Sequence, residues 1–143
     1  MSSGYDLPVS PLAPASFPTL PRVGGVETAL FSLGLYKGKP RNDLLVMRFP
    51  NGAEVGGAFT TSLTRSADID WCREALTAGG GRARVLVVNT GNSNAFTGRA
   101  GVEKNAETVA IAARLAGCAP HEVFVSATGV IGAIGGMLGL SAL

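Results

Sequence analysis

The fold is decided by one stretch, Glu122-Val123-Phe124-Val125-Ser126-Ala127-Thr128-Gly129-Val130-Ile131-Gly132. Its first half is rich in β-branched and aromatic residues, which predicts a strand directed into a core. We expect the strand to break at Thr128-Gly129, because glycine lets the backbone turn sharply and approach a ligand without a Cβ. Such a break leaves backbone N–H groups unpaired, and convergent N–H groups are the donors of an oxyanion hole. The alternative interpretation is a strand followed by an ordinary tight turn.

Length and composition indicate one globular domain. The chain has 143 residues, enough to bury a real core, with 46% hydrophobic and 15% charged residues. The net charge of +2 comes from dispersed side chains. The nearest basic cluster, residues 37–41, contains Gly and Pro and no aromatic residues, so nucleic-acid binding is disfavoured.

The sequence gives no sign of a metal site, a cofactor motif or a secretory signal. Cys72, Cys118 and His121 are too few for a four-ligand zinc site without carboxylates, and Cys72 is expected to be a small buried hydrophobe. No basic segment precedes an apolar one at the N-terminus. The longest nearly apolar run, residues 130–143, is too short to span a bilayer. We therefore expect a cytoplasmic protein in a reducing setting.

The chain divides into three parts. Residues 1–24 contain five of the eight prolines and predict an extended arm. Apolar residues between those prolines suggest that the arm lies on the body of the protein. Residues 25–132 form the predicted α/β domain, and residues 133–143 form an apolar, glycine-rich tail.

Within the domain, strands and helices are expected to alternate. The expected elements are a strand over 26–36, a hairpin of strands 44–49 and 53–60, a helix over 66–78, a strand over 83–89, and a helix over about 101–115. The hairpin prediction depends on Asn51-Gly52, which supplies the positive φ angles of a tight turn. On the second helix, Ala106, Val109, Ala110 and Ala113 are expected to form a small-residue packing face. The order of elements predicts helices packed on a sheet.

Two places could carry chemistry, and both follow predicted strands. No phosphate-binding loop and no G-x-S-x-G elbow is present. His121 is best interpreted as a solvated loop residue, and the acidic pair Asp68 and Asp70 as favourable charges at a helix start. The candidates that remain are the turn Thr128-Gly129 and a polar loop over 89–97, because ligands of α/β proteins bind beyond strand ends.

The polar loop has two open interpretations. Its side-chain amide and hydroxyl groups could bind a substrate, or they could satisfy the backbone of the loop itself. The candidate substrate-pocket residues are Asn89, Thr90, Gly91, Asn92 and Asn94.

Four segments, in collinear order, resemble the bifunctional ornithine acetyltransferase (glutamate N-acetyltransferase) family of arginine biosynthesis. They are Ser10-Pro11-Leu12-Ala13-Pro14, Asp70-Trp71-Cys72-Arg73, Val87-Val88-Asn89-Thr90-Gly91-Asn92-Ser93-Asn94-Ala95 and Ser126-Ala127-Thr128-Gly129-Val130-Ile131-Gly132. The asparagine-rich loop and the last motif are the specific parts of the resemblance.

The resemblance implies the N-terminal, α-chain portion of a self-processing acyltransferase. Family precursors cut themselves before a threonine, which then heads a β chain and carries the acetyl group from N-acetylornithine to glutamate as an ester. The family's oxyanion-hole pair matches Thr128 and Gly129. The implied fold is an αββα sandwich, shared with self-processing aminopeptidases and assembled as an α2β2 heterotetramer. No cofactor is implied, although acetyl-CoA is a co-substrate of some members.

After Gly132 the sequence departs from the family pattern, and the chain contains no match to the nucleophilic threonine. We therefore expect the attacking group to come from a β-chain partner. The alternative is a truncated, non-catalytic α/β module or partner-binding fragment.

Overall fold

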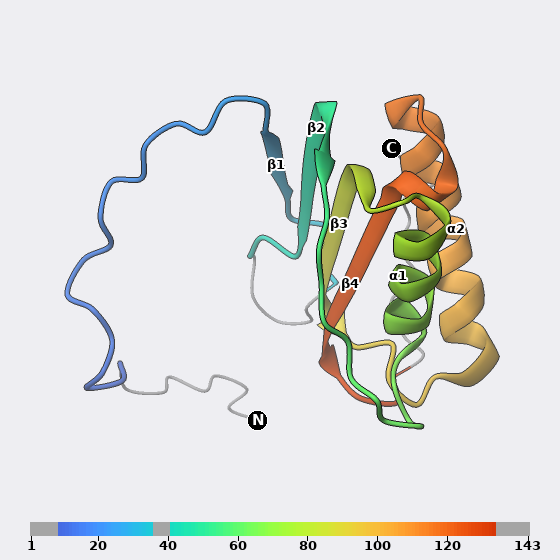
Figure 1. The fold of residues 1–143 in the computed structure, drawn as a ribbon. Coiled ribbons are helices and arrows are strands. Elements are labelled where there is room, and N and C mark those ends of the chain that lie inside the picture. The colour runs from blue at the N-terminus through green and yellow to red at the C-terminus, as the bar shows by residue number, and fades with distance from the viewer. Residues whose placement is uncertain (1–8, 36–40, 134–143) are drawn as a thin grey trace.

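The computed structural model describes residues 9–35 and 41–133 (Figure 1). Four strands form one sheet in the order β1-β2-β3-β4. They are β1 (Glu27–Phe31), β2 (Leu44–Glu54), β3 (Arg82–Asn92) and β4 (Val123–Val130). Strand β2 is antiparallel to both β1 and β3, whereas β3 and β4 are parallel.

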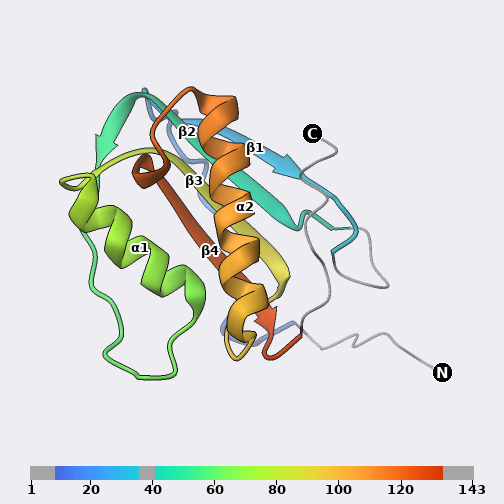
Figure 2. The same ribbon diagram turned by 90° about the vertical axis from the view of Figure 1, so that its right-hand side faces the viewer.

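Helices α1 (Ala67–Ala78) and α2 (Gly98–Ala116) cover the same face of this sheet (Figures 1 and 2). Helix α1 ends at Gly79, and α2 ends at Gly117, whose φ of 63° is the left-handed conformation that glycine adopts readily. A 3-10 turn, Pro120–Glu122, leads into β4. The predicted α/β fold, with helices on a sheet, is confirmed.

The core lies between the sheet and the two helices. Val85 and Val87 of β3 are buried on this side and pair in register with Val123 and Val125 of β4, which are also buried. The buried apolar residues are Leu44, Cys72, Ala75, Ala83, Val85, Val87, Val109, Ala113, Val123, Phe124 and Val125. Of these, Phe124 alternates with Val123 and Val125 and so lies on the other face of the sheet. Packing on the face that the helices cover orients the two parallel strands, whose carboxyl ends lie together at one end of the sheet.

The predicted hairpin at Asn51-Gly52 is wrong. Strand β2 runs through these residues and pairs with β3 on both sides of them, with a register shift between Arg48 and Ala53. Gly52 does adopt a positive φ of 77°, but in a bulge and not in a turn. The local turn signal is correct about the backbone and misleading about the partner strand.

Three further expectations need correction. Thr128-Gly129 lies inside β4, which continues to Val130, and the turn follows at Ile131-Gly132. Strand β3 likewise extends to Asn92, and only residues 93–97 of the polar loop are irregular. In the N-terminal arm, Leu12, Phe17 and Leu20 are more than four-fifths exposed and do not pack on the body.

The small-residue face predicted for the second helix is half right. Val109 and Ala113 are buried, but Ala106 and Ala110 are exposed. The other buried residues of α2 are Gly101, Lys104, Asn105 and Thr108.

Part of the basic cluster (37–40) and nearly all of the apolar tail (134–143) lie outside the described residues. Across the ranges 9–35 and 41–133, neither helix has the length and apolar character of a membrane span.

Candidate active site

The two predicted sites meet at one edge of the sheet. Because β3 and β4 are parallel, their carboxyl ends lie side by side, and Thr90, Gly91 and Asn92 pair with Thr128, Gly129 and Val130 respectively. The carboxyl ends of neighbouring parallel strands are where α/β proteins bind ligands. The structure therefore joins the asparagine-rich stretch and the Thr-Gly pair into one candidate site.

Two glycines allow the strand ends to approach closely. Gly129 has a φ of +131°, and a Cβ built on it would lie 2.6 Å from the carbonyl carbon of Gly91 and 2.9 Å from the nitrogen of Asn92. Gly91 has a φ of +125°, and its Cβ would lie 2.9 Å from the carbonyl oxygen of Leu35. Both positions combine a conformation that L-residues rarely adopt with no room for a side chain.

The outer edge of β4 shows which way its N–H groups point. On the side away from β3, the Trp71 indole donates to the carbonyl of Val123 (2.9 Å), and the Cys72 thiol donates to the carbonyl of Val125 (3.2 Å). The N–H of Ala127 also points there and donates to Asp68 Oδ2 (3.4 Å). Since backbone groups alternate along a strand, the N–H of Gly129 faces the same outer edge.

The Thr128 side chain lies on the opposite face of the sheet from the helices. Side chains alternate along β4, and Val123 and Val125 point toward the helices, so Thr128 points away from them. Thr128 and Gly129 are both exposed. The strand end thus presents a hydroxyl and an outward N–H to solvent at one corner of the sheet.

Beneath this corner the polar residues are buried. Asn89, Asn92 and Asn94 are 3–7% exposed. Asn94 Nδ2 donates to Asn105 Oδ1 (2.7 Å), and Asn89 Nδ2 lies 3.5 Å from the Asn92 carbonyl. Thr97 donates its hydroxyl to the Asn94 carbonyl (2.9 Å). Asn89 and Thr97 thus bond backbone carbonyls of the polar stretch itself, as the second interpretation expects, whereas Asn94 bonds a side chain of α2.

A buried lysine joins the same network. Lys104 of α2 is 9% exposed, and its Nζ donates to Asn92 Oδ1 (2.8 Å). Burial lowers the pKa of Lys104, and the negative charge of Asp68 opposes part of that change. Asp68 is itself 6% exposed, and its Oδ1 has no hydrogen-bond partner among the described residues.

The Asp43 carboxylate holds the segment 33–35, which lies beside the end of β3, by hydrogen bonds. It is 1% exposed, and its two carboxylate oxygens accept the N–H groups of Leu33 and Leu35, each at 2.7 Å. Its own carbonyl accepts the N–H of Thr90 (2.9 Å). Burial acts to raise the pKa of the Asp43 carboxyl, but the hydrogen bonds from backbone N–H groups outweigh it and hold that pKa below its usual value. Asp43 therefore places Leu35 against Gly91.

We expect Asp43→Asn to lower the free energy of unfolding at pH 7 by about 2 kcal/mol, because one backbone N–H loses its acceptor. The folded-state pKa of Asp43 is depressed, so its contribution is full above the unfolded pKa of about 3.9 and is lost as pH falls through the folded value. Urea unfolding of both proteins at pH 7 and at progressively lower pH measures the difference.

The exposed Glu107→Gln is the matched control for that series and should change stability by less than about 0.5 kcal/mol. A difference between Asp43→Asn and the parent that stays constant down to about pH 2, below the ordinary carboxyl range, contradicts this role for the carboxylate.

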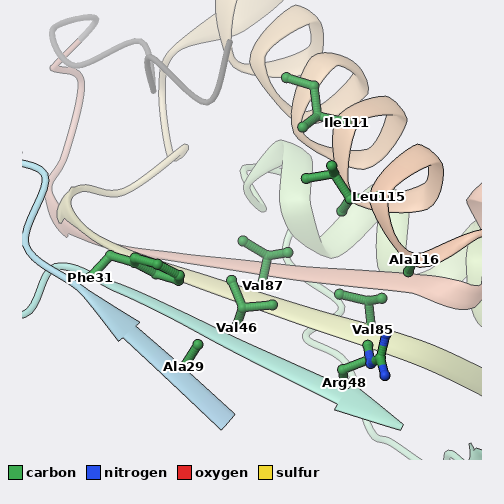
Figure 3. Close-up of a pocket in the computed structure, with 10 residues that line it drawn as sticks. Ala29, Phe31, Val46, Arg48, Val85, Val87, Ile111, Leu115 and Ala116 are labelled. Carbon is green, nitrogen blue, oxygen red and sulfur yellow. The ribbon is translucent and has the colours of Figure 1, made fainter. Parts of the chain in front are cut away.

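A second hollow has an apolar character and lies away from these strand ends. In Figure 3, Ile111 and Leu115 of α2 face Val46 and Val87 of the sheet across a groove of about 250 Å³. Its one charged lining residue, Arg48, pairs with Glu27 at 2.7 Å. No convergent polar groups line the groove among the residues that the structure describes, so we do not regard it as the reactive site.

Reasoning from the sequence misses the supports of the candidate site. The sequence interpretation of Asp68 is a charge favouring the helix start, whereas Asp68 is buried and accepts the Ala127 N–H. Lys104 and Asn105 receive no role from the sequence, although with Thr108 they occupy the helical face that continues to Val109 and Ala113. That polar extension of an apolar face is the signal that could find them. For Asp43 the sequence carries no comparable signal.

Comparisons with known proteins agree on one family. The sequence model of the ArgJ family matches residues 27–138. The arginine biosynthesis bifunctional protein ArgJ of Mesorhizobium japonicum is 52% identical over 124 residues, and that of Bradyrhizobium diazoefficiens is 47% identical over 124 residues. Both matches cover 87% of this chain, which spans 29% of the length of these relatives.

Two solved structures share the fold. The crystal structure of the arginine biosynthesis bifunctional protein ArgJ from Bacillus halodurans matches with a TM-score of 0.75 and 25% identity, over 83% of this chain and 61% of that one. Ornithine acetyltransferase of Mycobacterium tuberculosis, solved in complex with ornithine, matches with a TM-score of 0.72 and 30% identity, over 83% of this chain and 63% of that one.

Proposed function

Since the chain belongs to the ArgJ family, we propose that it supplies the oxyanion hole of an acetyltransferase of arginine biosynthesis. The whole enzyme transfers an acetyl group from N-acetylornithine to glutamate. The observation that carries this proposal is the corner of the sheet at which the outward N–H of Gly129 and the hydroxyl of Thr128 are both exposed. Acyl transfer requires donors of this kind, already fixed before the reaction.

In the proposed reaction, the hydroxyl of an N-terminal threonine on a partner segment attacks the acetyl carbonyl of N-acetylornithine. The carbonyl oxygen becomes an oxyanion, which accepts hydrogen bonds from Gly129 and Thr128. Collapse breaks the amide bond, ornithine leaves with the proton of the nucleophile, and an acetyl ester remains. The amino group of glutamate then attacks this ester, and the threonine is released. Each donor contributes on the order of 3 kcal/mol to the barrier reduction.

The partner in this proposal is the β chain of an α2β2 assembly. Within residues 9–35 and 41–133, both helices cover the same face of the sheet (Figure 1), and Thr128 projects from the other face. A second sheet packed there would give the αββα sandwich implied by the family resemblance and would bring the nucleophile to the side of Thr128. Acetyl-CoA could serve as an alternative donor at the same site, since it presents the same acyl carbonyl.

The asparagine-rich stretch has a supporting role in this mechanism. Asn89, Asn92 and Asn94 are buried and bonded to groups of the protein, so they shape the strand ends and do not contact the substrate. Thr90 and Gly91 are less buried and lie directly beside Thr128 and Gly129. Of the polar stretch, these two are the residues we propose to lie nearest the substrate.

Reconstitution tests the proposal. The chain is co-expressed with the C-terminal remainder of the Mesorhizobium japonicum relative, and transfer from N-acetylornithine to glutamate is measured on the purified complex. We expect transfer by the complex and none by either part alone. Formation of a stable complex that transfers no acetyl group contradicts the proposal.

A further inference from the structure

Two buried, oppositely charged side chains lie beneath the strand ends without any role in the chemistry above. Asp68 lies in the first turn of α1 and is 6% exposed, and Lys104 of α2 is 9% exposed. The negative charge of Asp68 acts to raise the pKa of Lys104 against the effect of burial. Burying two charges is costly, and a buried pair is a poor source of stability compared with apolar side chains of similar size. Their position therefore calls for another explanation.

Hydrogen bonds connect the two charged side chains to the two ends of one backbone segment, directly for Asp68 and through Asn92 for Lys104. Asp68 Oδ2 accepts the N–H of Ala127, the residue before Thr128 (3.4 Å). Lys104 Nζ holds Asn92 Oδ1 (2.8 Å), and Asn92 Nδ2 in turn lies 3.4 Å from the carbonyl oxygen of Ala133. The segment from Ala127 to Ala133 contains Thr128 and Gly129. Asp68 therefore holds this segment before the two donors, and Lys104 holds it after them through Asn92.

We propose that Asp68 and Lys104 are positioning residues, which hold the Thr128-Gly129 strand end in its donating orientation and keep its surroundings electrically neutral. This inference rests on the proposed oxyanion-hole function. An anionic acceptor fixes the peptide plane of Ala127, and through strand alternation it fixes the direction of the Gly129 N–H. A lone carboxylate beside an oxyanion would oppose the developing negative charge, and the ammonium of Lys104 cancels that effect.

The first test measures the chain itself and needs no activity. Amide hydrogen exchange is followed by NMR in the parent, Asp68→Ala and Arg99→Met, the last removing an exposed α2 cation that pairs with Glu103. We expect exchange at Ala127 to become roughly tenfold faster in Asp68→Ala, because the N–H of Ala127 loses its acceptor. Core amides such as that of Val87, and all amides of Arg99→Met, should be unchanged. Equal acceleration at Val87 and Ala127, or no change at Ala127, overturns the proposal.

The second test uses the reconstituted complex and a double-mutant cycle. We expect Lys104→Met to lower kcat about tenfold with little change in KM, since it leaves the charge of Asp68 unopposed. Adding Asp68→Asn should restore part of that loss, because the uncompensated charge is removed. Additive losses in the double variant, or a change confined to KM, overturn the positioning role. A parent complex without activity counts against the proposed function, while the exchange experiment still decides on the pair.

Discussion

Replacing Thr128 with valine is expected to lower kcat of the reconstituted transferase about 100-fold and to leave KM nearly unchanged. The hydroxyl is one of two donors proposed for the oxyanion, and loss of one such donor costs on the order of 3 kcal/mol in the transition state. An interaction made only in the transition state affects kcat and kcat/KM alike. Steady-state kinetics with N-acetylornithine and glutamate measure both constants.

The design of this variant separates chemistry from folding. Valine is β-branched like threonine and suits a strand, and position 128 is exposed at the end of β4, so stability should hold. Thr128→Ser keeps the hydroxyl and serves as the matched control, with kcat expected within a few-fold of the parent. A Thr128→Val enzyme as fast as the Thr128→Ser enzyme contradicts a role for the hydroxyl.

Replacing Gly129 with alanine is expected to damage both the structure and the activity. The added Cβ would lie 2.6 Å from the Gly91 carbonyl carbon and 2.7 Å from its oxygen, and these are backbone atoms that cannot rotate away. The φ of +131° adds conformational strain for any L-residue with a side chain. Overpacking and strain together should lower the free energy of unfolding by on the order of 3 kcal/mol.

Denaturant unfolding of Gly129→Ala measures that loss. Gly132→Ala is the control, because Gly132 also has a positive φ (+73°), but a Cβ added there would meet no atom within 4 Å. It should therefore show the strain without the collision and lose clearly less stability. Equal losses in the two variants contradict the close approach of β3 and β4 at Gly91 and Gly129.

Regular patterns in the sequence predict the elements that depend on local physics. Alternating β-branched residues predict β4, and Ser66 and Gly79 mark the ends of α1, where the structure has them. The error at Asn51-Gly52 has a clear cause. A two-residue turn and a bulge need the same positive φ, and only the non-local pairing of β2 with β3 distinguishes them.

The candidate site divides in the same way. The prediction that Thr128 and Gly129 form the oxyanion hole comes from a local motif and from a family resemblance, and it remains a prediction. Their supports depend on contacts between residues that are not adjacent in sequence, 59 residues apart for Asp68 and Ala127 and eight apart for Asp43 and Leu35. Buried carboxylates and amides of this kind show no periodicity, because they satisfy particular backbone groups and do not form a repeating face.

Formation of the acetyl ester is the most direct measurement of the central claim that Thr128 and Gly129 stabilise an acyl-transfer oxyanion. The reconstituted complex is mixed with N-acetylornithine alone, quenched at short times, and the acetylated partner segment is quantified by mass spectrometry. We predict rapid acetylation of its N-terminal threonine with the parent chain and acetylation about 100-fold slower with Thr128→Val. Equal rates with the two chains, or no acetylation with either, would contradict the claim.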